Sequence, residues 1–276
     1  MAFPEYSGML SPRVSVVIPA LNEARNLPHV FPRIPADVHE VILVDGGSVD
    51  GTARTARKLR PDVHVVVQRR RSKWNALARG FAEATGDIVA ILDGDGSADP
   101  AAIPRFVTAL LSGAEFAKGT RFAAGCDRSD VTRLRRLGNR MLSGLVNVLC
   151  GTQYSDLCYG LSAVWRRHLP VLGLDAALAG RAGGGRSCRD GYATGARILI
   201  RVAAARLVVA ELPSFDPPRI PVIGNLDALG AGVGMLRAIL VEHRRARRRR
   251  PPPSSSSAVH RPGEAVHRPG EDESFT

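Results

Sequence analysis

Short apolar runs alternate with mixed apolar and polar segments from residue 14 to about residue 117. The runs are rich in β-branched residues, have strand length and end at turn-forming residues, which is typical of strands buried on both faces. They predict strands at Val14–Ile18, Glu40–Val44, Val63–Val67, Asp87–Leu92 and Glu115–Ala117. The segments between them predict helices at Asn22–Leu27, Thr52–Leu59, Ser72–Ala84 and 101–112. Strands that alternate with helices at this spacing indicate βαβ units and a parallel sheet.

The pattern changes after Lys118. A polar loop at 120–130 precedes a predicted helix at Val131–Cys150, in which four arginines stand among leucines. Residues 180–191 are rich in glycine and arginine and are expected to be mobile. A helix at 196–205, a strand at Leu207–Glu211 and a terminal helix at about 227–243 are predicted to follow.

The last segment, 244–276, has the composition of a disordered tail. It begins with an arginine run at 244–250, continues through prolines and serines, and ends with the repeat Ala258–Glu264 and Ala265–Glu271. Such a segment buries too little apolar surface to order itself. We therefore predict a lead-in at 1–13, one folded domain at 14–243 and a tail at 244–276.

The composition narrows the class of protein. A chain of 276 residues with 45% hydrophobic residues can bury a full core. The net charge of +12 favours anionic partners. The four cysteines show no paired spacing, which fits a reducing cytoplasm. No signal peptide is evident, and no run reaches the length of about 18 apolar residues that a membrane span needs.

The candidate chemistry lies where the fourth predicted strand ends. Asp93 and Asp95 follow the apolar run 88–92 in an Asp-Gly-Asp-Gly-Ser sequence. Carboxyl ends of strands hold the ligand sites of open α/β sheets, and two carboxylates one residue apart can reach one divalent cation. Oxygen ligands suit Mg²⁺ or Mn²⁺ that also binds substrate phosphates. A polar turn that caps Asp99 onto the next helix explains the same residues without a metal.

Several motifs in order resemble the family 2 glycosyltransferases of GT-A fold. They are Val16–Glu23 (VVIPALNE), Val41–Thr52 (VILVDGGSVDGT), Lys73 before Asn75-Ala76-Leu77, Asp93-Gly94-Asp95 and Lys118–Phe122 (KGTRF). The segment Asp156–Ala163 (DLCYGLSA) resembles polyprenyl-phosphate sugar transferases of the dolichol-phosphate mannosyltransferase type. The resemblance implies a Rossmann-like, mostly parallel sheet flanked by helices. It also implies an enzyme that moves a sugar, with inversion, from a nucleotide-diphosphate sugar to an acceptor, with a polyprenyl phosphate as the expected acceptor.

The resemblance assigns roles to individual residues. It implies that Pro19, Asn22 and Glu23 line the base and ribose, that Asp45 contacts the base, and that Lys73 offsets diphosphate charge. Turn, cap and solvated-lysine roles remain open for these positions. Asp93 and Asp95 are the expected catalytic metal ligands, with Mg²⁺ or Mn²⁺ as cofactor.

Arginines are the expected phosphate ligands, because their forked donors match phosphate oxygens. Arg121, Arg133 and Arg136 are candidates for the acceptor phosphate, with Arg121 also catalytic, although a solvated helix face explains Arg133 and Arg136 equally. Arg219 resembles a loop arginine that closes over the diphosphate. The chain departs from its relatives after Asp190-Gly191-Tyr192, where they commonly carry acidic residues and this chain has Ala193–Arg197. A phosphate acceptor needs no carboxylate base, because no proton must leave it.

Other classes of protein compete with this interpretation. A degenerate, non-catalytic family member fits the missing acidic residues and Trp74, which stands where relatives often have glycine. A phosphatase of the haloacid dehalogenase type shares an Asp-x-Asp-Gly-Ser loop, but there the loop follows the first strand. A nucleic-acid-binding protein fits the basic charge, but aromatic residues are scarce at 5%, so we expect no nucleic-acid partner.

A cytoplasmic enzyme with a lipid acceptor must reach the inner face of the membrane. The predicted terminal helix carries Leu229, Val233, Leu236, Ile239 and Leu240 at near-helical spacing, and the arginine run 244–250 follows it. Apolar and basic residues together predict peripheral membrane contact. A helix packed on the sheet with an inert tail is the alternative.

Overall fold

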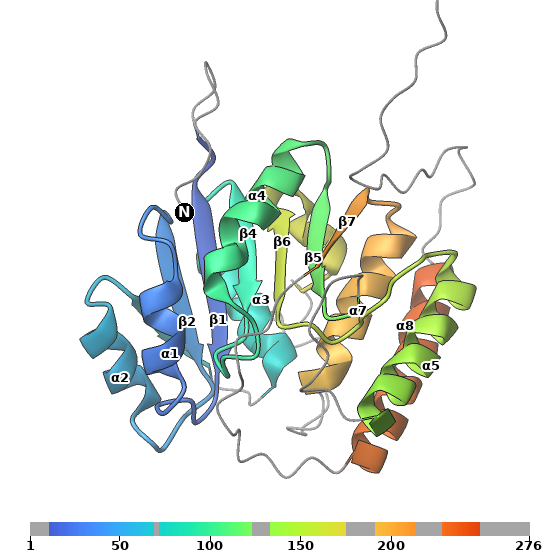
Figure 1. Cartoon of the computed structure of the whole chain (residues 1–276), viewed down its shortest axis with the longest axis horizontal. Helices are drawn as coiled ribbons and strands as arrows, with labels where there is room; N and C mark the ends of the chain where they lie inside the picture. The colour runs from blue at the N-terminus through green and yellow to red at the C-terminus, as the bar shows by residue number, and fades with distance from the viewer. Residues whose placement is uncertain (1–10, 69–71, 123–132, 175–190, 214–227, 249–276) are drawn as a thin grey trace, which may run out of the picture.

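In a computed structural model the chain folds around a seven-stranded sheet (Figure 1). The structure describes residues 11–68, 72–122, 133–174, 191–213 and 228–248. The strands stand in the order β3-β2-β1-β4-β6-β5-β7. Their bounds are β1 Val14–Ala20, β2 Glu40–Asp45, β3 His64–Val67, β4 Ile88–Leu92, β5 Phe116–Thr120, β6 Leu161–Trp165 and β7 Val209–Pro213. The pairs β1–β2, β1–β4, β2–β3 and β5–β7 are parallel, and only β6 runs antiparallel to its neighbours among these strands.

Helices cover both faces of the sheet. One apolar core lies under α3 (Lys73–Glu83), α5 (Arg133–Cys150), α7 (Gly191–Ala204) and α8 (Ala228–Arg248). The other core lies under α1 (Leu27–Val30), α2 (Thr52–Leu59) and α4 (Ile103–Leu111), together with the short 3₁₀ segment η1 (Phe31–Arg33). Alternate residues of β1 serve the two cores, since Val17 belongs to the first and Val16 and Ile18 to the second. This two-faced burial explains the continuous apolar runs of the sequence.

Local sequence signals set the ends of several elements. Ser72 caps α3 by accepting a hydrogen bond from the Asn75 N–H, and Asp99 caps the 3₁₀ turn η2 (Pro100–Ala102) before α4. Gly80 allows α3 to lie close to the sheet, because a Cβ there would stand 2.3 Å from Cγ1 of Val17. The start of α3, where Lys73 stands, is therefore fixed both by its cap and by close packing on β1.

The predicted elements are confirmed for most of the first half, and in the second half α5 and β7 also lie within two residues of their predictions. Strands β1, β2, β3 and β4 and helices α2 and α3 lie within two residues of their predicted positions. The predicted helix at Asn22–Leu27 is wrong: Asn22 has φ of 59°, in the left-handed region, and the helix begins only at Leu27. Strand β6 and the following 3₁₀ segment η3 (Arg166–Leu172) were not predicted.

The C-terminal half shows two further differences. Helix α7 begins at Gly191 rather than 196. Helix α8 continues to Arg248, so the first residues of the predicted disordered tail are helical. The rest of the tail, the loop 123–132 and the segment 175–190 lie outside the described residues. Within the described part of the chain, no helix combines the length and apolar character needed to cross a membrane.

A buried ion pair attaches α8 to the rest of the domain. Arg201 of α7 donates from Nε to Oε1 of Glu242 at 2.6 Å, and the Glu242 side chain is 5% exposed. The same guanidinium donates to the carbonyl oxygens of Leu172 and Gly173, and it stacks over the Trp74 ring at 4.7 Å. One cation thereby joins α7, α8, the end of η3 and α3.

Loss of the Glu242 charge is expected to destabilise the fold. Glu242→Gln leaves the Arg201 cation buried without its counter-ion, which typically costs about 3 kcal/mol or more in the free energy of unfolding. Urea unfolding followed by circular dichroism measures the loss. The control is Glu83→Gln in the partly exposed Arg79–Glu83 pair, for which we expect less than about 1 kcal/mol. Equal losses in the two variants would contradict the special role of the buried pair.

Candidate nucleotide-sugar site

The carboxyl ends of β1, β2 and β4 meet at one edge of the sheet, because these strands are parallel neighbours. In the register of β1 and β2, Pro19 stands opposite Val44 and Ala20 opposite Asp45. The loop after β1 carries Asn22 and Glu23, and the loop after β4 carries Asp93 and Asp95. The topology thus brings the predicted donor-binding residues from three chain segments to a single edge.

Side-chain hydrogen bonds lock the loops after β1 and β2 together. Asn22 donates its N–H to Ser48 Oγ at 2.9 Å and accepts from the Val49 N–H through Oδ1 at 3.0 Å. Asp45 accepts from both the N–H and the hydroxyl of Ser48 through Oδ1, at 3.0 and 2.5 Å. These contacts occupy one oxygen of Asp45 and leave Oδ2 as an acceptor at the edge. The left-handed backbone at Asn22, which an Asn tolerates well, shapes this loop.

Glu23 lies among several carboxylates. Its side chain accepts a hydrogen bond from Asn26 Nδ2 at 2.6 Å. Burial raises the pKa of Glu23 from 4.5 to about 7; the nearby charges of Asp95, Asp93 and Asp50 add to the effect, and the hydrogen bond from Asn26 opposes it. The carboxyl is therefore partly protonated near neutral pH, because ionisation would add another negative charge to this cluster.

Lys73 and Asp93 form the ion pair at the centre of the site. The Lys73 ammonium lies 2.6 Å from Oδ1 and 2.7 Å from Oδ2 of Asp93 and donates its hydrogen bond to Oδ2. Burial alone would lower the pKa of Lys73, but the charge and hydrogen bond of Asp93, with the charge of Asp95, raise it. Burial acts to raise the pKa of Asp93, and the ammonium opposes that rise. The net result is a raised pKa for both groups, so Lys73 stays protonated while burial and the charge of Asp95 make Asp93 harder to ionise than an exposed aspartate.

Asp95 lies beside this pair with a different set of contacts. Its Oδ1 accepts the Ser97 N–H at 2.9 Å, and its side chain is only partly buried. The Asp93 backbone N–H donates to the Gly160 carbonyl at 2.9 Å, which fixes the loop against the segment before β6. Among the described residues, no group of three His, Cys, Asp or Glu side chains surrounds a single point. A Mg²⁺ or Mn²⁺ ion fits this donor set when substrate phosphates complete its shell, since both ions bind carboxylate oxygens and keep positions for phosphates.

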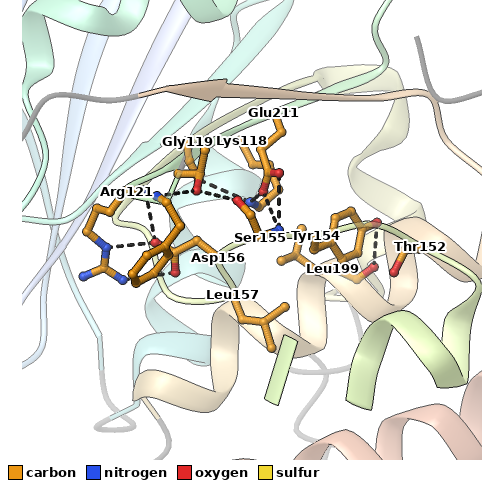
Figure 2. A network of polar contacts seen from close by, with 12 residues as sticks. Lys118, Gly119, Arg121, Thr152, Tyr154, Ser155, Asp156, Leu157, Leu199 and Glu211 are labelled. Atoms are coloured by element: carbon orange, nitrogen blue, oxygen red, sulfur yellow. Dashed lines mark hydrogen bonds and ion pairs between the residues drawn. The ribbon is translucent and has the colours of Figure 1, made fainter. Parts of the chain in front are cut away.

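Arg121 is held by a buried carboxylate from another segment (Figure 2). Its Nε and Nη2 donate to Oδ2 and Oδ1 of Asp156 at 2.8 and 3.0 Å, in a two-pronged pair, and Asp156 is fully buried. Burial opposes ionisation of Asp156, but the charge and hydrogen bonds of Arg121 dominate and lower its pKa. Asp156 therefore fixes the orientation of the guanidinium and leaves it fewer donors for a ligand.

A second ion pair lies next to the first, as Figure 2 also shows. Lys118 of β5 pairs with Glu211 of β7, and Glu211 accepts the Ser155 N–H at 3.1 Å. Ser155 also shares a 2.6 Å hydrogen bond with the Thr120 hydroxyl. These contacts anchor the segment 154–158 to two strands, and Asp156 reaches Arg121 from that anchored segment.

Cys158 lies in the same segment as Asp156 and donates its backbone N–H to Oδ1 of Asp156 at 2.9 Å. Its pKa rises to about 12, mainly through burial and then through the charge of Asp156, while the charges of Arg121, Lys73 and Lys118 oppose the rise. The thiol is therefore neutral at physiological pH. The segment that holds Arg121 through Asp156 also contacts the donor residues, because the Gly160 carbonyl accepts the Asp93 N–H.

The remaining predicted arginines are less closely defined. Arg133 is the first residue of α5, and its side chain lies outside the described part of the structure. Arg136 is exposed on the first turns of α5. Arg219 lies outside the described residues. The roles of these three arginines stay predictions.

Sequence reasoning missed the partners that hold the site in place. Asp156 was noted only as part of a motif, although it fixes Arg121. The stack of Trp74 on Arg201 was not foreseen; the ring is 3% exposed, and it explains how this chain accommodates a large side chain beside Lys73. Gly119 also has a packing role, since a Cβ there would stand 2.3 Å from the Tyr159 ring. Gly119 belongs to a motif that the sequence shows, whereas the contacts of Asp156 with Arg121 and of Trp74 with Arg201 join distant parts of the chain and could not be predicted.

Comparison with known proteins places the chain in a family. The model of glycosyl transferase family 2 matches residues 15–172, more than half of the chain. A dolichol-phosphate mannosyltransferase of Pyrococcus furiosus is 36% identical over 120 residues, which cover 41% of this chain and 34% of that protein. An undecaprenyl-phosphate 4-deoxy-4-formamido-L-arabinose transferase of Yersinia enterocolitica is 31% identical over 169 residues, 57% of this chain and 50% of that protein. The matched segments thus span a third to a half of these relatives.

Solved structures agree on the fold. Glucosyl-3-phosphoglycerate synthase from Mycobacterium tuberculosis, crystallised with Mn²⁺, uridine diphosphate and glucosyl-3-phosphoglycerate, superimposes with a TM-score of 0.62 and 24% identity. The superposition covers 84% of this chain and 80% of that one. The mostly parallel sheet and its flanking helices therefore have the expected Rossmann-like GT-A architecture. Together with the family match and the order of its motifs, this shows that the chain belongs to glycosyl transferase family 2.

Proposed function

We propose that this protein transfers a sugar from a nucleotide-diphosphate sugar to a polyprenyl phosphate, with inversion and with Mg²⁺ or Mn²⁺ as cofactor. The observation that carries the proposal is the Lys73–Asp93 pair with Asp95 beside it, at the same sheet edge as Asn22, Glu23 and Asp45. The names of the relatives support a polyprenyl-phosphate acceptor, and the ligands of the structural neighbour support a metal and a nucleotide donor.

The geometry of the β1–β2 edge suits the nucleoside. Asp45 presents Oδ2 where the strands end, and Pro19 and Asn22 form the adjoining wall of the loop. A carboxylate oxygen accepts a hydrogen bond from a base N–H, and the loop is rigid because Ser48 and Val49 hold it. Preorganised contacts of this kind reduce the entropy lost on binding.

The β4 edge suits the diphosphate. Asp95 and Asp93 would hold the metal ion, which neutralises the charge that develops on the leaving nucleotide diphosphate. Asp95 is the more direct ligand, because Asp93 already carries the Lys73 ammonium. Lys73 balances negative charge in the buried part of the site and positions Asp93. Arg219, which lies outside the described residues, is proposed to close over the diphosphate.

An acceptor phosphate suits the rest of the site. Helix α7 begins with Gly191 and Tyr192 and continues with Ala193–Ala196, so its first turns offer no carboxylate as a base. A phosphate acceptor is already ionised and needs none. Arg121 is oriented by Asp156, and Arg133 and Arg136 begin the helix that follows. These cations are proposed to bind the acceptor phosphate, while the donor carbon is attacked by one of its oxygens.

The acceptor is tested with a short-chain polyprenyl phosphate, the matching polyprenol and labelled nucleotide sugars. We expect transfer only to the phosphate. Arg136→Gln should lower kcat/KM for the acceptor about 10- to 100-fold, the usual loss for a hydrogen bond between charged groups. The control is Arg140→Gln, which removes another exposed arginine one turn further along α5. Transfer to the polyprenol, or equal effects of the two variants, would contradict the assignment; no turnover with any donor would favour a non-catalytic protein.

The pKa of Glu23 predicts a pH dependence of metal binding. Glu23 is largely protonated below about pH 7 and ionised above it. A cation near Asp95 stabilises the ionised form, so Mn²⁺ affinity in the presence of nucleotide diphosphate should rise with pH, by at most about tenfold from pH 6 to pH 8. Calorimetry in buffers of different ionisation enthalpy should also detect a released proton. In Glu23→Gln the rise should flatten; an unchanged profile would show that another group titrates.

A further inference from the structure

The exposed large apolar side chains of the described residues are concentrated on two neighbouring helices. On α5, Leu137, Met141 and Val148 are 57%, 68% and 84% exposed, and on α8, Val233 is 70% exposed. Leu236, Leu240 and Val241 of α8 are also exposed. Helices α5 and α8 pack against each other at the β7 end of the molecule (Figure 1). Apolar groups gathered in this way mark an interaction surface.

The spacing arranges these side chains in stripes. Leu137, Met141 and Val148 stand at positions i, i+4 and i+11 of α5, which lie on one side of a helix. Val233, Leu236 and Leu240 stand at i, i+3 and i+7 of α8. The opposite side of α8 is the buried one, where Met235, Ala238 and Ile239 face the core. Of the apolar residues expected to face a membrane, Ile239 is therefore excluded, and the side chain of Leu229 lies outside the described residues.

Among the described residues of α5 and α8, the exposed charged side chains are all arginines. Arg136 and Arg140 are exposed on α5, and Arg237, Arg244 and Arg245 are exposed on α8. Helix α5 contains no acidic residue, and the single acidic residue of α8, Glu242, is buried on Arg201. We define the α5–α8 face as the surface formed by the two apolar stripes and three arginines: Leu137, Met141, Val148, Val233, Leu236, Leu240, Arg140, Arg237 and Arg244.

We propose that the α5–α8 face docks the protein on the surface of an anionic lipid bilayer. Apolar side chains that enter the headgroup region, flanked by arginines that contact lipid phosphates, are the chemistry of a peripheral membrane surface. An apolar protein partner would not need the exposed arginines Arg140, Arg237 and Arg244 beside the stripes; another exposed arginine, Arg245, lies 3.8 Å from Glu242. The buried Arg201–Glu242 pair holds α8 firmly on the domain, so docking fixes the orientation of the whole sheet. The reason for docking, access to a lipid acceptor, rests on the proposed function; the docking itself rests on this face.

The direct test is flotation of the full-length protein with vesicles. Vesicles of phosphatidylcholine alone are compared with vesicles that also contain phosphatidylglycerol, at low and at high salt. We expect binding to the anionic vesicles at low salt and partial release at high salt. Replacing Arg140, Arg237 and Arg244 with Gln should weaken this binding by about 100-fold at low salt, given the usual contribution of each basic residue. Met141→Gln with Leu236→Gln and Leu240→Gln should weaken it at both salt concentrations.

The matched control removes the same charge from the other end of the sheet. Arg54, Arg57 and Lys58 are exposed or partly exposed on α2, and their replacement with Gln should leave vesicle binding within about twofold of the unaltered protein. All variants should keep metal-dependent binding of uridine diphosphate, which separates a docking defect from a failed donor site. The proposal would be overturned if the protein does not float with the vesicles. It would also be overturned if the α2 variant and the arginine variant of the α5–α8 face lose vesicle binding equally. Light scattering that shows a dimer broken by the apolar variants would also overturn it, because the face would then join two copies.

Discussion

One partly buried ammonium makes the donor edge of this sheet possible. The carboxyl ends of β1, β2 and β4 gather Glu23, Asp93 and Asp95 into one neighbourhood, and so many acidic groups repel one another at short range. Lys73 lies against both oxygens of Asp93, and its positive charge offsets one of these negative charges. The Ser72 cap and the close approach of Gly80 to Val17 hold its helix in the required place. The consequence is a site that keeps one carboxylate paired and leaves Asp95 to interact with a cation.

Ion pairs between a cation and a carboxylate also recur in the second half of the domain. Arg121 pairs with Asp156, Lys118 with Glu211, and Arg201 with Glu242, and in each pair the two residues come from different elements. Buried pairs of this kind add little net stability but are costly to break. They therefore act as fixed attachment points. The segment before β6 and helix α8 hold their places relative to the parallel strands through these contacts, and so does the guanidinium proposed to bind the acceptor.

The sequence was most informative where local rules dominate. Continuous apolar runs located β1, β2 and β4, because burial on both faces of a sheet is a local consequence of residue type. The helix predicted at Ser72–Ala84 was also found, as α3. The loop at Asn22 was predicted as a helix because its left-handed backbone depends on hydrogen bonds to Ser48 and Val49, which come from the loop after β2. Strand β6 was missed because its five residues carry no turn or periodic signal that separates them from the preceding motif.

The same distinction between local and long-range signals applies to the residues of the candidate site. Motif order identified Asn22, Glu23, Asp45, Lys73, Asp93 and Asp95, and the topology brings their segments to one edge. Their partners were not predictable, since the Lys73–Asp93, Arg121–Asp156 and Trp74–Arg201 contacts join residues far apart in the chain. The exposed stripes of α5 and α8 could likewise be predicted only in part. The periodicity of a sequence shows that a helix has apolar positions, but it does not show which of them the core covers.

The most direct test of this account is calorimetric binding of uridine diphosphate with and without Mn²⁺, to the unaltered protein and to Asp95→Asn. The substitution keeps the shape of the side chain and removes its charge, while the Lys73–Asp93 pair remains. We expect Mn²⁺ to strengthen binding to the unaltered protein and Asp95→Asn to lose most of this gain, with the fold intact by circular dichroism. If the gain from Mn²⁺ is the same in both proteins, Asp95 is only part of a turn and the proposed donor site is wrong.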